Sequence, residues 1–318
     1  MSFRRLMRIV RRCLLLAVLT TLAITVGLFV YRFLFSYTYD NSLEGLSDED
    51  LAVSAKPASG ITNIALFGID TRPDEPTRSD CMMVMSVNAD TGTIKLISLM
   101  RDSEVEIEGH GTQKLCHAYS YGGPELAIKT INQTFDLNIT DYAEVNFVQM
   151  ANLIGEVGGV DIDVSEAERV EANKYIKEYY ESFDMEPELI EEAGYQHLNG
   201  IQAMTYARIR KGGTGDDWGR VERQSIVLEA MFETVQDKSI TELVAMMPRL
   251  LPYVTTSLKK SEMVSLAKGL FANGQPQMEH SRVPKDGEWE YGGSQEQYIV
   301  YDLDKAAQDI NDYIYGDS

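Results

Sequence analysis

One uncharged stretch near the amino terminus limits what this chain can fold into more than any other feature. Residues 13–31 read CLLLAVLTTLAITVGLFVY, which is 19 residues without a charge. At about 1.5 Å of rise per helical residue, this run spans the hydrocarbon core of a bilayer. Five arginines precede the run and Arg32 follows it, so the positive-inside rule places the amino terminus in the cytoplasm. The sequence predicts a single-pass protein of the cell membrane, with everything after residue 35 extracytoplasmic.

A cleaved signal peptide is the alternative to this anchor, but its apolar core is shorter and ends in small residues. Here the run ends in LFVYRFLF, so an uncleaved anchor is favoured. The next segment, 36–60, is acidic, has few large side chains and ends near Pro and Gly, which is typical of a linker. We therefore expect a cytoplasmic tail (1–12), a transmembrane anchor (13–35), an extracytoplasmic stalk (36–60) and one large domain (61–318).

The charge of the outer part excludes one class of partner. The whole chain has 29 Lys and Arg against 49 Asp and Glu, a formal net charge of −20. Residues 1–32 hold six arginines and no acid, so the remaining residues carry a net charge of −26. A nucleic-acid binder needs a basic surface to neutralise phosphates, so no nucleic acid is expected as a partner. The 4 His and 3 Cys are dispersed, which gives little support to a zinc site.

Strand-like and helix-like patterns alternate along the outer part. Apolar runs at 61–69, 81–87 and 93–99 predict strands, the last two joined by a turn at 88–92. Pro124 stands at a first helical position, and Ala127, Ile128, Ile131 and Phe135 mark one helical face after it. Further helices are predicted at 147–157, 198–209 and 221–235, with a strand at 160–164. The intermixed elements predict an α/β fold with a mixed sheet.

Charged residues gather at the ends of these predicted elements. Asp70 ends the first strand, Asp80 precedes the second and Arg101 follows the third. Two carboxylates at strand ends suit a hard cation such as Mg²⁺. Guanidinium groups suit a multiply charged oxyanion, so the set points to a pyrophosphate, with ordinary surface ion pairs as the alternative. The arginines in question are Arg78, Arg101, Arg208, Arg210, Arg220 and Arg223.

Seven segments, in order over about residues 61–236, resemble the successive motifs of the LytR–CpsA–Psr family. They are IALFGIDTR, TRSDCMMV, ISLMRDS, KLCHAYSYGGPELAIKTIN, VGGVDIDV, HLNGIQAMTYARIR and DWGRVERQ. The resemblance implies an extracytoplasmic phosphotransferase. Such an enzyme moves a glycopolymer, of teichoic acid or capsular type, from a polyprenyl-pyrophosphate carrier in the membrane lipid to peptidoglycan. It also implies a three-layer α/β/α fold that encloses an apolar lipid tunnel.

Two other functions stay open beside this one: a lipid-pyrophosphate hydrolase, and a non-catalytic membrane-anchored regulator of wall biogenesis. The resemblance assigns magnesium binding to Asp70 and Asp80, with Mn²⁺ as a possible substitute for Mg²⁺. It assigns catalysis to Asp70, Arg101, Arg208 and Arg210, with Asp70 or a neighbouring carboxylate as the general base. The implied substrate-binding positions are Arg78, Arg101, Lys114, Arg208, Arg210, Asp217, Arg220 and Gln224.

Two cysteines depart from the family pattern: Cys81, where Thr is common, and Cys116, where Asn is usual. Buried free thiols are favoured at both positions, with a disulfide between them as the alternative. The sequence does not indicate what residues 257–318 do. Aromatic residues there and just before fit either a core or carbohydrate contacts, the core being favoured. They are Tyr253, Trp289, Tyr291 and Tyr298.

Overall fold

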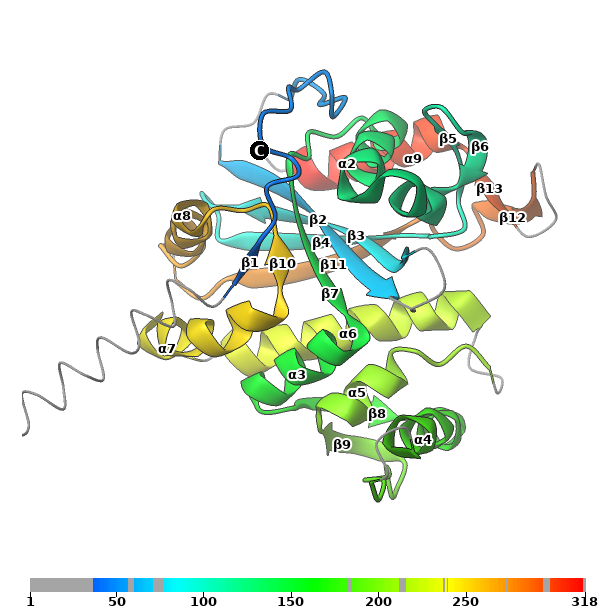
Figure 1. Cartoon of the computed structure of the whole chain (residues 1–318), viewed down its shortest axis with the longest axis vertical. Helices are drawn as coiled ribbons and strands as arrows, with labels where there is room; N and C mark the ends of the chain where they lie inside the picture. Colours follow the sequence, from blue (N-terminus) through cyan, green and yellow to red (C-terminus); the bar gives the residue numbers. More distant parts are fainter. Residues whose placement is uncertain are drawn as a thin grey trace, which may run out of the picture.

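A mixed sheet of seven strands runs through the centre of this computed structural model (Figure 1). Across the sheet the strands are β1 (Thr38–Tyr39), β10 (Thr255–Thr256), β7 (Asp141–Asn146), β2 (Ile61–Asp70), β3 (Arg78–Asn88), β4 (Thr93–Leu99) and β11 (Gln277–Val283). The pairs β2–β3, β3–β4 and β7–β10 are antiparallel. The pairs β2–β7, β4–β11 and β1–β10 are parallel. The predicted α/β class with a mixed sheet is confirmed.

The structure describes residues 37–56, 60–70, 77–181, 185–211, 216–236, 238, 240–272, 274–293 and 298–316, without the side chains at 216, 217, 240, 241 and 244. None of the helices in these ranges combines the length and the apolar character that crossing a membrane requires. The predicted anchor at 13–35 lies outside the described residues.

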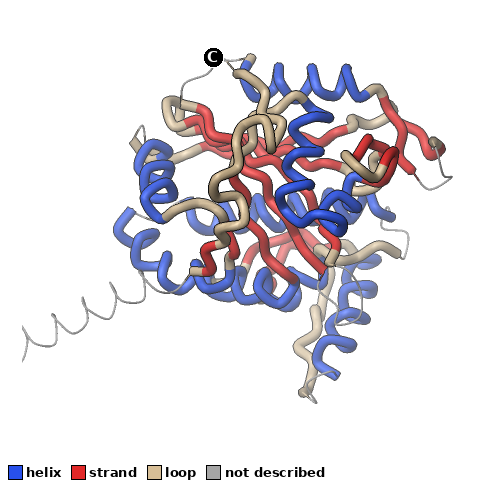
Figure 2. Tube along the Cα trace, turned by 45° about the horizontal axis from the view of Figure 1, so that its top comes forward, coloured by secondary structure: helices blue, strands red, loops and turns tan. Residues whose placement is uncertain are grey.

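Helices cover both faces of the central sheet (Figures 1 and 2). One face carries α2 (Leu115–Phe135) and α9 (Leu303–Tyr315), and the other carries α3 (Phe147–Val157), α6 (Asp216–Gln236) and α7 (Ile240–Leu250). The remaining helices are α4 (Glu166–Glu181), α5 (Gly200–Tyr206), α8 (Lys260–Leu270) and the 3₁₀ turn η1 (Leu251–Tyr253). Three two-stranded ribbons complete the fold: β5 (Glu104–Ile107) with β6 (Gly111–Lys114), β8 (Val160–Val164) with β9 (Gly194–Leu198), and β12 (Trp289–Gly292) with β13 (Tyr298–Tyr301).

Two apolar cores hold these layers together. The larger one lies between the sheet and α2 with α9, where Phe67, Phe135 and Tyr142 are almost fully buried. The second lies among α3, α4, α5, α6 and the β8–β9 ribbon. The helical face predicted after Pro124 is buried in the larger core, as expected from its spacing. Removing apolar area from water is what fixes these helices to the sheet.

Helix boundaries differ from the predicted ones where a cap or a glycine intervenes. The helix predicted to open at Pro124 already begins at Leu115, because non-helical Gly122 and Gly123 join two helical segments. Pro124 opens the second segment, where its missing N–H costs nothing. The helix predicted at 198–209 is shorter, because Asn199 caps its first turn and accepts from two backbone N–H groups.

The predicted stalk is wrong for residues 37–56, which pack onto the domain. β1 pairs with β10, and the backbone N–H of Ser54 donates to the carbonyl of Leu137 at 2.9 Å. Leu43 and Leu51 are buried in the larger core. The few large side chains of this acidic segment are therefore used for docking, since leaving them in water would forfeit their burial energy. The folded domain therefore includes residues 37–56 in addition to the part predicted from residue 61 onward.

A half-buried histidine, His280, lies between the sheet and α6. The Nε2 atom of His280 is 2.7 Å from the Oγ of Ser225 and 3.2 Å from the Oγ of Ser98. Burial lowers the pKa of His280 and outweighs the opposite effect of the nearby carboxylates Glu222 and Glu229, while Arg282 lowers it further. The folded protein therefore binds this proton less readily than the unfolded chain does.

We predict that this histidine makes stability fall on acidification. Its contribution is fully present above the unfolded pKa near 6.5 and is lost as the pH drops below that value. The slope is at most about 1.4 kcal/mol per pH unit for one proton. Thermal or urea unfolding measured between neutral pH and about pH 5 should show a shallower decline for His280→Gln than for the natural chain. His197→Gln, at an exposed position paired with Asp161, is the control; an equal decline in all three proteins would contradict the assignment.

Candidate functional site

A bulge at the edge of the β2–β3 pair sets the position of Asp80. Gly68 pairs with Cys81 and the next residue, Ile69, pairs with Ser79, so Asp80 is the extra residue on β3. A bulge re-aims the side chain that it carries. Gly68 allows the close approach, because a Cβ there would lie 2.8 Å from the Cβ of Cys81. Asp70, the last residue of β2, lines the same cavity as Asp80.

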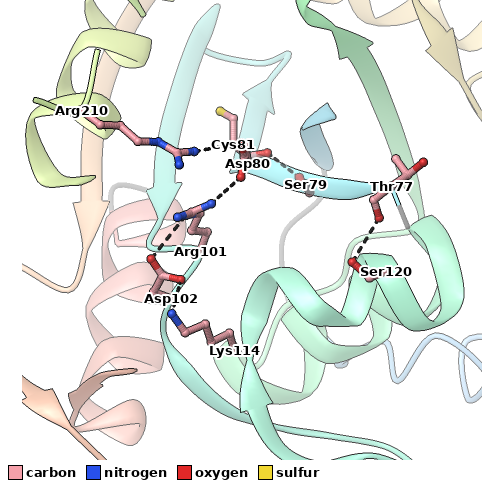
Figure 3. A network of polar contacts seen from close by, with 9 residues as sticks. All are labelled: Thr77, Ser79, Asp80, Cys81, Arg101, Asp102, Lys114, Ser120 and Arg210. Atoms are coloured by element: carbon pink, nitrogen blue, oxygen red, sulfur yellow. Dashed lines mark hydrogen bonds and ion pairs between the residues drawn. The ribbon is translucent and has the colours of Figure 1, made fainter. Parts of the chain in front are cut away.

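Two arginines donate hydrogen bonds to Asp80, one to each carboxylate oxygen. Arg101 follows β4 and donates from Nη1 to Oδ1 at 2.5 Å, while Arg210 follows α5 and donates from Nη2 to Oδ2 at 2.9 Å. The carboxylate side chain is only 13% exposed. Figure 3 shows the two guanidinium groups reaching Asp80 from separate elements. Residues 80, 101 and 210, far apart in the sequence, therefore meet in one ion-paired group.

The electrostatics of Asp80 follow from this contact. Burial alone would raise its pKa, but the cationic groups of Arg101, Arg220 and Arg210 outweigh burial and hold the pKa below its usual value. Asp80 is therefore ionised throughout the physiological pH range. An ionised carboxylate surrounded by three guanidinium groups leaves a surplus of positive charge at this end of the sheet.

A second carboxylate, that of Asp102, also contacts Arg101. Asp102 is 6% exposed and contacts the Nε of Arg101 at 3.3 Å, and it accepts from the Nζ of Lys114 at 2.8 Å. The chain of alternating charges Lys114–Asp102–Arg101–Asp80–Arg210 is visible in Figure 3. Lys114, at the end of β6, thus belongs to this network through Asp102 and is not among the described residues that line the cavity. Its contact with Asp102 helps to fix the orientation of Arg101.

The charged cavity beside Asp80 contains most of the residues predicted as the site. Its lining is Asp70, Asp80, Phe147, Tyr175, Arg208, Arg210, Arg220 and Gln224. Three guanidinium groups face two carboxylates in this lining. Arg220 is almost fully buried in α6, and Gln224 follows one helical turn later on the same helix. Residues from β2, β3, the segment after α5 and α6 thus line one cavity.

An apolar cavity adjoins the charged one. It is lined mainly by apolar side chains from β2, β7, α3, α5 and α6, including Met150, Met204 and Leu228. Phe147, Arg208 and Gln224 line both cavities, so the two are contiguous. The guanidinium of Arg208 lies 4.3 Å from the ring centroid of Phe147, a cation–π contact that holds it at the junction. The combined space has an apolar end and a cationic end.

Sequence reasoning missed two residues that shape this site and gave a third, Arg223, a different role. Phe147 and Tyr175 stack on Arg208, the second with its centroid 5.8 Å from the guanidinium carbon. Arg223 was counted among the phosphate-binding arginines, but it is buried and donates to the carbonyl of Ile209 at 2.7 Å. It therefore ties the segment that carries Arg208 to α6. Helical periodicity could not have indicated this division of roles, because Arg220 and Arg223 are three residues apart and lie on the same side of α6.

Arg78 is not among the described residues that line the cavity. Arg78 is exposed at the start of β3, near His117; burial lowers the pKa of that histidine and Arg78 lowers it further. The side chain of Asp217 lies outside the described residues.

Both described cysteines are unpaired, as expected. Burial raises the pKa of Cys81 to about 12 and that of Cys116 to about 11. Because the thiolate is the reactive form, both side chains act as small apolar groups.

The donor set of the cavity suits magnesium. Asp70 and Asp80 supply hard carboxylate oxygens, and Mg²⁺ is commonly held by one or two carboxylates together with substrate phosphates. Among the described residues, no group of three or more His, Cys, Asp and Glu side chains could hold a metal ion without such help. The residues therefore fit a metal that arrives with a phosphorylated ligand, rather than a site made by protein ligands alone.

Comparison with known proteins gives the family. The LytR_cpsA_psr family model matches residues 30–312. The polyisoprenyl-teichoic acid–peptidoglycan teichoic acid transferase TagU of Bacillus mycoides (strain KBAB4) is 28% identical over 78% of this chain and 76% of its own length. A structure of TagT bound to LIIa-WTA is similar with a TM-score of 0.64 at 22% identity, over 88% of this chain and 98% of that one.

A second structure, the LytR-CPS2A-psr family protein YwtF (TagT) with bound octaprenyl pyrophosphate lipid, has a TM-score of 0.60 at 20% identity. The match covers 87% of this chain and 98% of that one. At these identities the two structures establish a shared fold. The family model covers nearly the whole chain, including every segment on which the resemblance rested. The protein therefore belongs to the LytR–CpsA–Psr family.

Proposed function

We propose that this protein transfers a glycopolymer from a polyprenyl-pyrophosphate carrier to peptidoglycan. The observation that carries the proposal is the contiguity of the two cavities, one apolar and one lined by three arginines. A polyprenyl pyrophosphate has the same two parts, an apolar chain and a multiply charged head. The name of the TagU relative and the octaprenyl pyrophosphate in the YwtF structure support the same substrate class. The apolar cavity is then the inner end of the lipid tunnel.

In this proposal the arginines neutralise the head group. Arg208, at the junction of the cavities, faces the phosphate attached to the lipid, and Arg210 and Arg220 face the phosphate attached to the glycan. An acceptor hydroxyl attacks the glycan-side phosphorus, the bond from that phosphorus to the bridging oxygen breaks, and polyprenyl phosphate leaves. Asp70 or a neighbouring carboxylate takes the hydroxyl proton. Preorganised guanidinium groups stabilise charge as it develops, which is the main source of catalysis in phosphoryl transfer.

Asp70 and Asp80 are the residues that would hold Mg²⁺, or Mn²⁺ in its place. The ion would supply additional positive charge to the pyrophosphate oxygens. Asp80 would then exchange part of its contact with Arg101 and Arg210 for the ion. That exchange would release guanidinium donors for the phosphates, so ligand binding and metal binding would favour each other.

The anchor predicted from residues 13–35 completes the proposal. It would hold the domain on the outer surface of the cell membrane, where the lipid carrier and the wall acceptor are both within reach. The folded domain includes residues that follow this segment closely, so the tether between them would be short.

The first prediction from the proposed function concerns the fork geometry of arginine. Arg208→Lys and Arg210→Lys should each reduce transfer, because lysine keeps the charge but cannot bind two oxygens at once. Each lost charge-assisted hydrogen bond should cost about 1.5–3 kcal/mol, or about one to two powers of ten in rate. Transfer from a synthetic polyprenyl-pyrophosphate glycan to peptidoglycan measures this. Arg169→Lys, in a surface pair with Glu166, is the matched control.

Near-normal rates for both site variants would mean that these arginines are ordinary ion-pair partners. Release of glycan phosphate without acceptor, at the rate of transfer, would instead favour the hydrolase. A chain that binds the lipid but turns over nothing would favour the regulator.

The second prediction concerns the metal. Removing divalent ions with a chelator should abolish transfer, and added Mg²⁺ should restore it. Asp70→Ala and Asp80→Ala should each remove the response to Mg²⁺, because a methyl group offers no oxygen ligand. Asp161→Ala, at an exposed position on β8 outside this cavity, is the control. Full activity of the chelated protein would eliminate the metal from the mechanism.

The third prediction tests the location. Protease added to intact protoplasts of a producing strain should digest the domain that includes residues 37–56. A short fragment that contains residues 13–35 should stay with the membrane. Permeabilised protoplasts provide the control for accessibility. Protection of the whole chain in intact protoplasts would rule out both the topology and the wall-polymer function.

A further inference from the structure

The carboxy-terminal ribbon β12–β13 packs against the segment that follows β4. The N–H of Ile299 donates to the carbonyl of Asp102 at 2.9 Å, and the hydroxyl of Tyr301 donates to Ser103 at 2.9 Å. Ile299 also packs with Met100 and Val221 in a small apolar cluster. The ribbon is therefore fixed to the segment that carries Arg101, directly beside the phosphate-binding network.

Three aromatic side chains gather at this place. The rings of Trp218 and Trp289 stack with centroids 4.4 Å apart and an interplanar angle of 27°. Tyr291 meets the edge of Trp289, with centroids 5.0 Å apart at 84°. Tyr291 is 56% exposed, whereas the two indoles are half-buried. The last ring of this aromatic stack, that of Tyr291, is therefore exposed to solvent.

This aromatic cluster, made of Trp218, Trp289 and Tyr291, adjoins the cationic cavity through α6. Trp218 and Val221 are three residues apart and share the helix face that meets the ribbon. Arg220 lies on another face of the same turn and lines the cavity. The cluster and the phosphate site are therefore joined through one turn of α6 and through the Met100–Arg101 peptide.

The charges around the cluster select among carbohydrates. Asp286, Glu288 and Glu290 are exposed acids before and within β12. Arg282, the cation over the Trp218 ring, is paired with Glu222 and Asp286. Glu288 is paired with Lys305, so most of these charges are compensated within the protein. The surface therefore offers little to bind an anionic polymer, while a sugar ring without charge can stack its C–H face on tyrosine and indole.

We infer that Trp218, Trp289 and Tyr291 form a saccharide-binding surface for the N-acetylated glycan strand of the peptidoglycan acceptor. The inference rests on the proposed function, because that reaction requires an acceptor hydroxyl beside the pyrophosphate. The lipid takes the apolar cavity and the head group takes the arginines, so the acceptor must approach from another side. The aromatic cluster offers a sugar-compatible surface within one turn of α6 from Arg220, which lines that cavity.

The test uses the full chain in detergent and the intrinsic fluorescence of tryptophan. The sequence contains 2 Trp, and both belong to the cluster. Chitotetraose, a soluble oligomer of N-acetylglucosamine, should therefore give a saturable change in this signal. Tyr291→Ala should weaken its binding about three- to tenfold, the range for loss of one aromatic contact. Tyr195→Ala, a 75% exposed tyrosine on the β8–β9 ribbon, is the matched control and should bind as the natural chain does.

Binding of octaprenyl pyrophosphate to the same preparations separates this inference from the proposed function and reports folding of the variants. Retained lipid binding with no saturable response to chitotetraose, or with equal affinity in Tyr291→Ala, overturns the saccharide surface and leaves the proposed function standing. Chitotetraose binding that depends on Tyr291, with no lipid binding by the natural chain, overturns the proposed function instead. In the transfer assay, Tyr291→Ala should raise the KM for acceptor by a similar factor; an increase confined to the donor KM would contradict the inference.

Discussion

The contact between Asp80 and two arginines is the interaction on which the rest of the site depends. Positive charge strong enough to bind a pyrophosphate would repel itself if it were assembled in one cavity without a counter-ion. Asp80 supplies that counter-ion, and the bulge on β3 puts it where Arg101 and Arg210 can both reach it. Asp102, which contacts Arg101, and Lys114, which contacts Asp102, continue this series of alternating acidic and basic side chains. The site is consequently stable before a ligand arrives and still carries a net positive charge.

The surrounding fold provides one cavity for the apolar part of a ligand and another for its charged part. Helices on one face of the sheet help to enclose the apolar cavity. In the charged cavity the strand ends supply the two carboxylates, and the segment after α5 and helix α6 supply the arginines. Arg208 marks the boundary, held between the rings of Phe147 and Tyr175. A guanidinium group can occupy this position because its planar face tolerates aromatic rings while its edge keeps its donors. An amphiphile would be placed with its head group at a fixed depth by this boundary alone.

Two segments that lie outside the seven family motifs complete the fold. Residues 37–56 dock onto the sheet and the larger core. The β12–β13 ribbon packs against the Arg101–Ser103 segment. Such segments escape sequence patterns, because two buried leucines or one short ribbon give no periodicity. Their positions follow from the surfaces that are left uncovered by the central sheet and its helices.

The sequence by itself determined the elements and their chemistry. Apolar runs predicted β2, β3 and β4 within a few residues, and the placement of Asp and Arg at strand ends indicated an oxyanion site. Only the tertiary structure decided which of these charges meet. Arg78 points to solvent while Arg220 is buried, and Arg223 binds a carbonyl rather than lining the cavity. The reason is physical: a local pattern fixes the face on which a side chain lies, but the bulge, the crossovers and the packing of distant helices fix what that face meets.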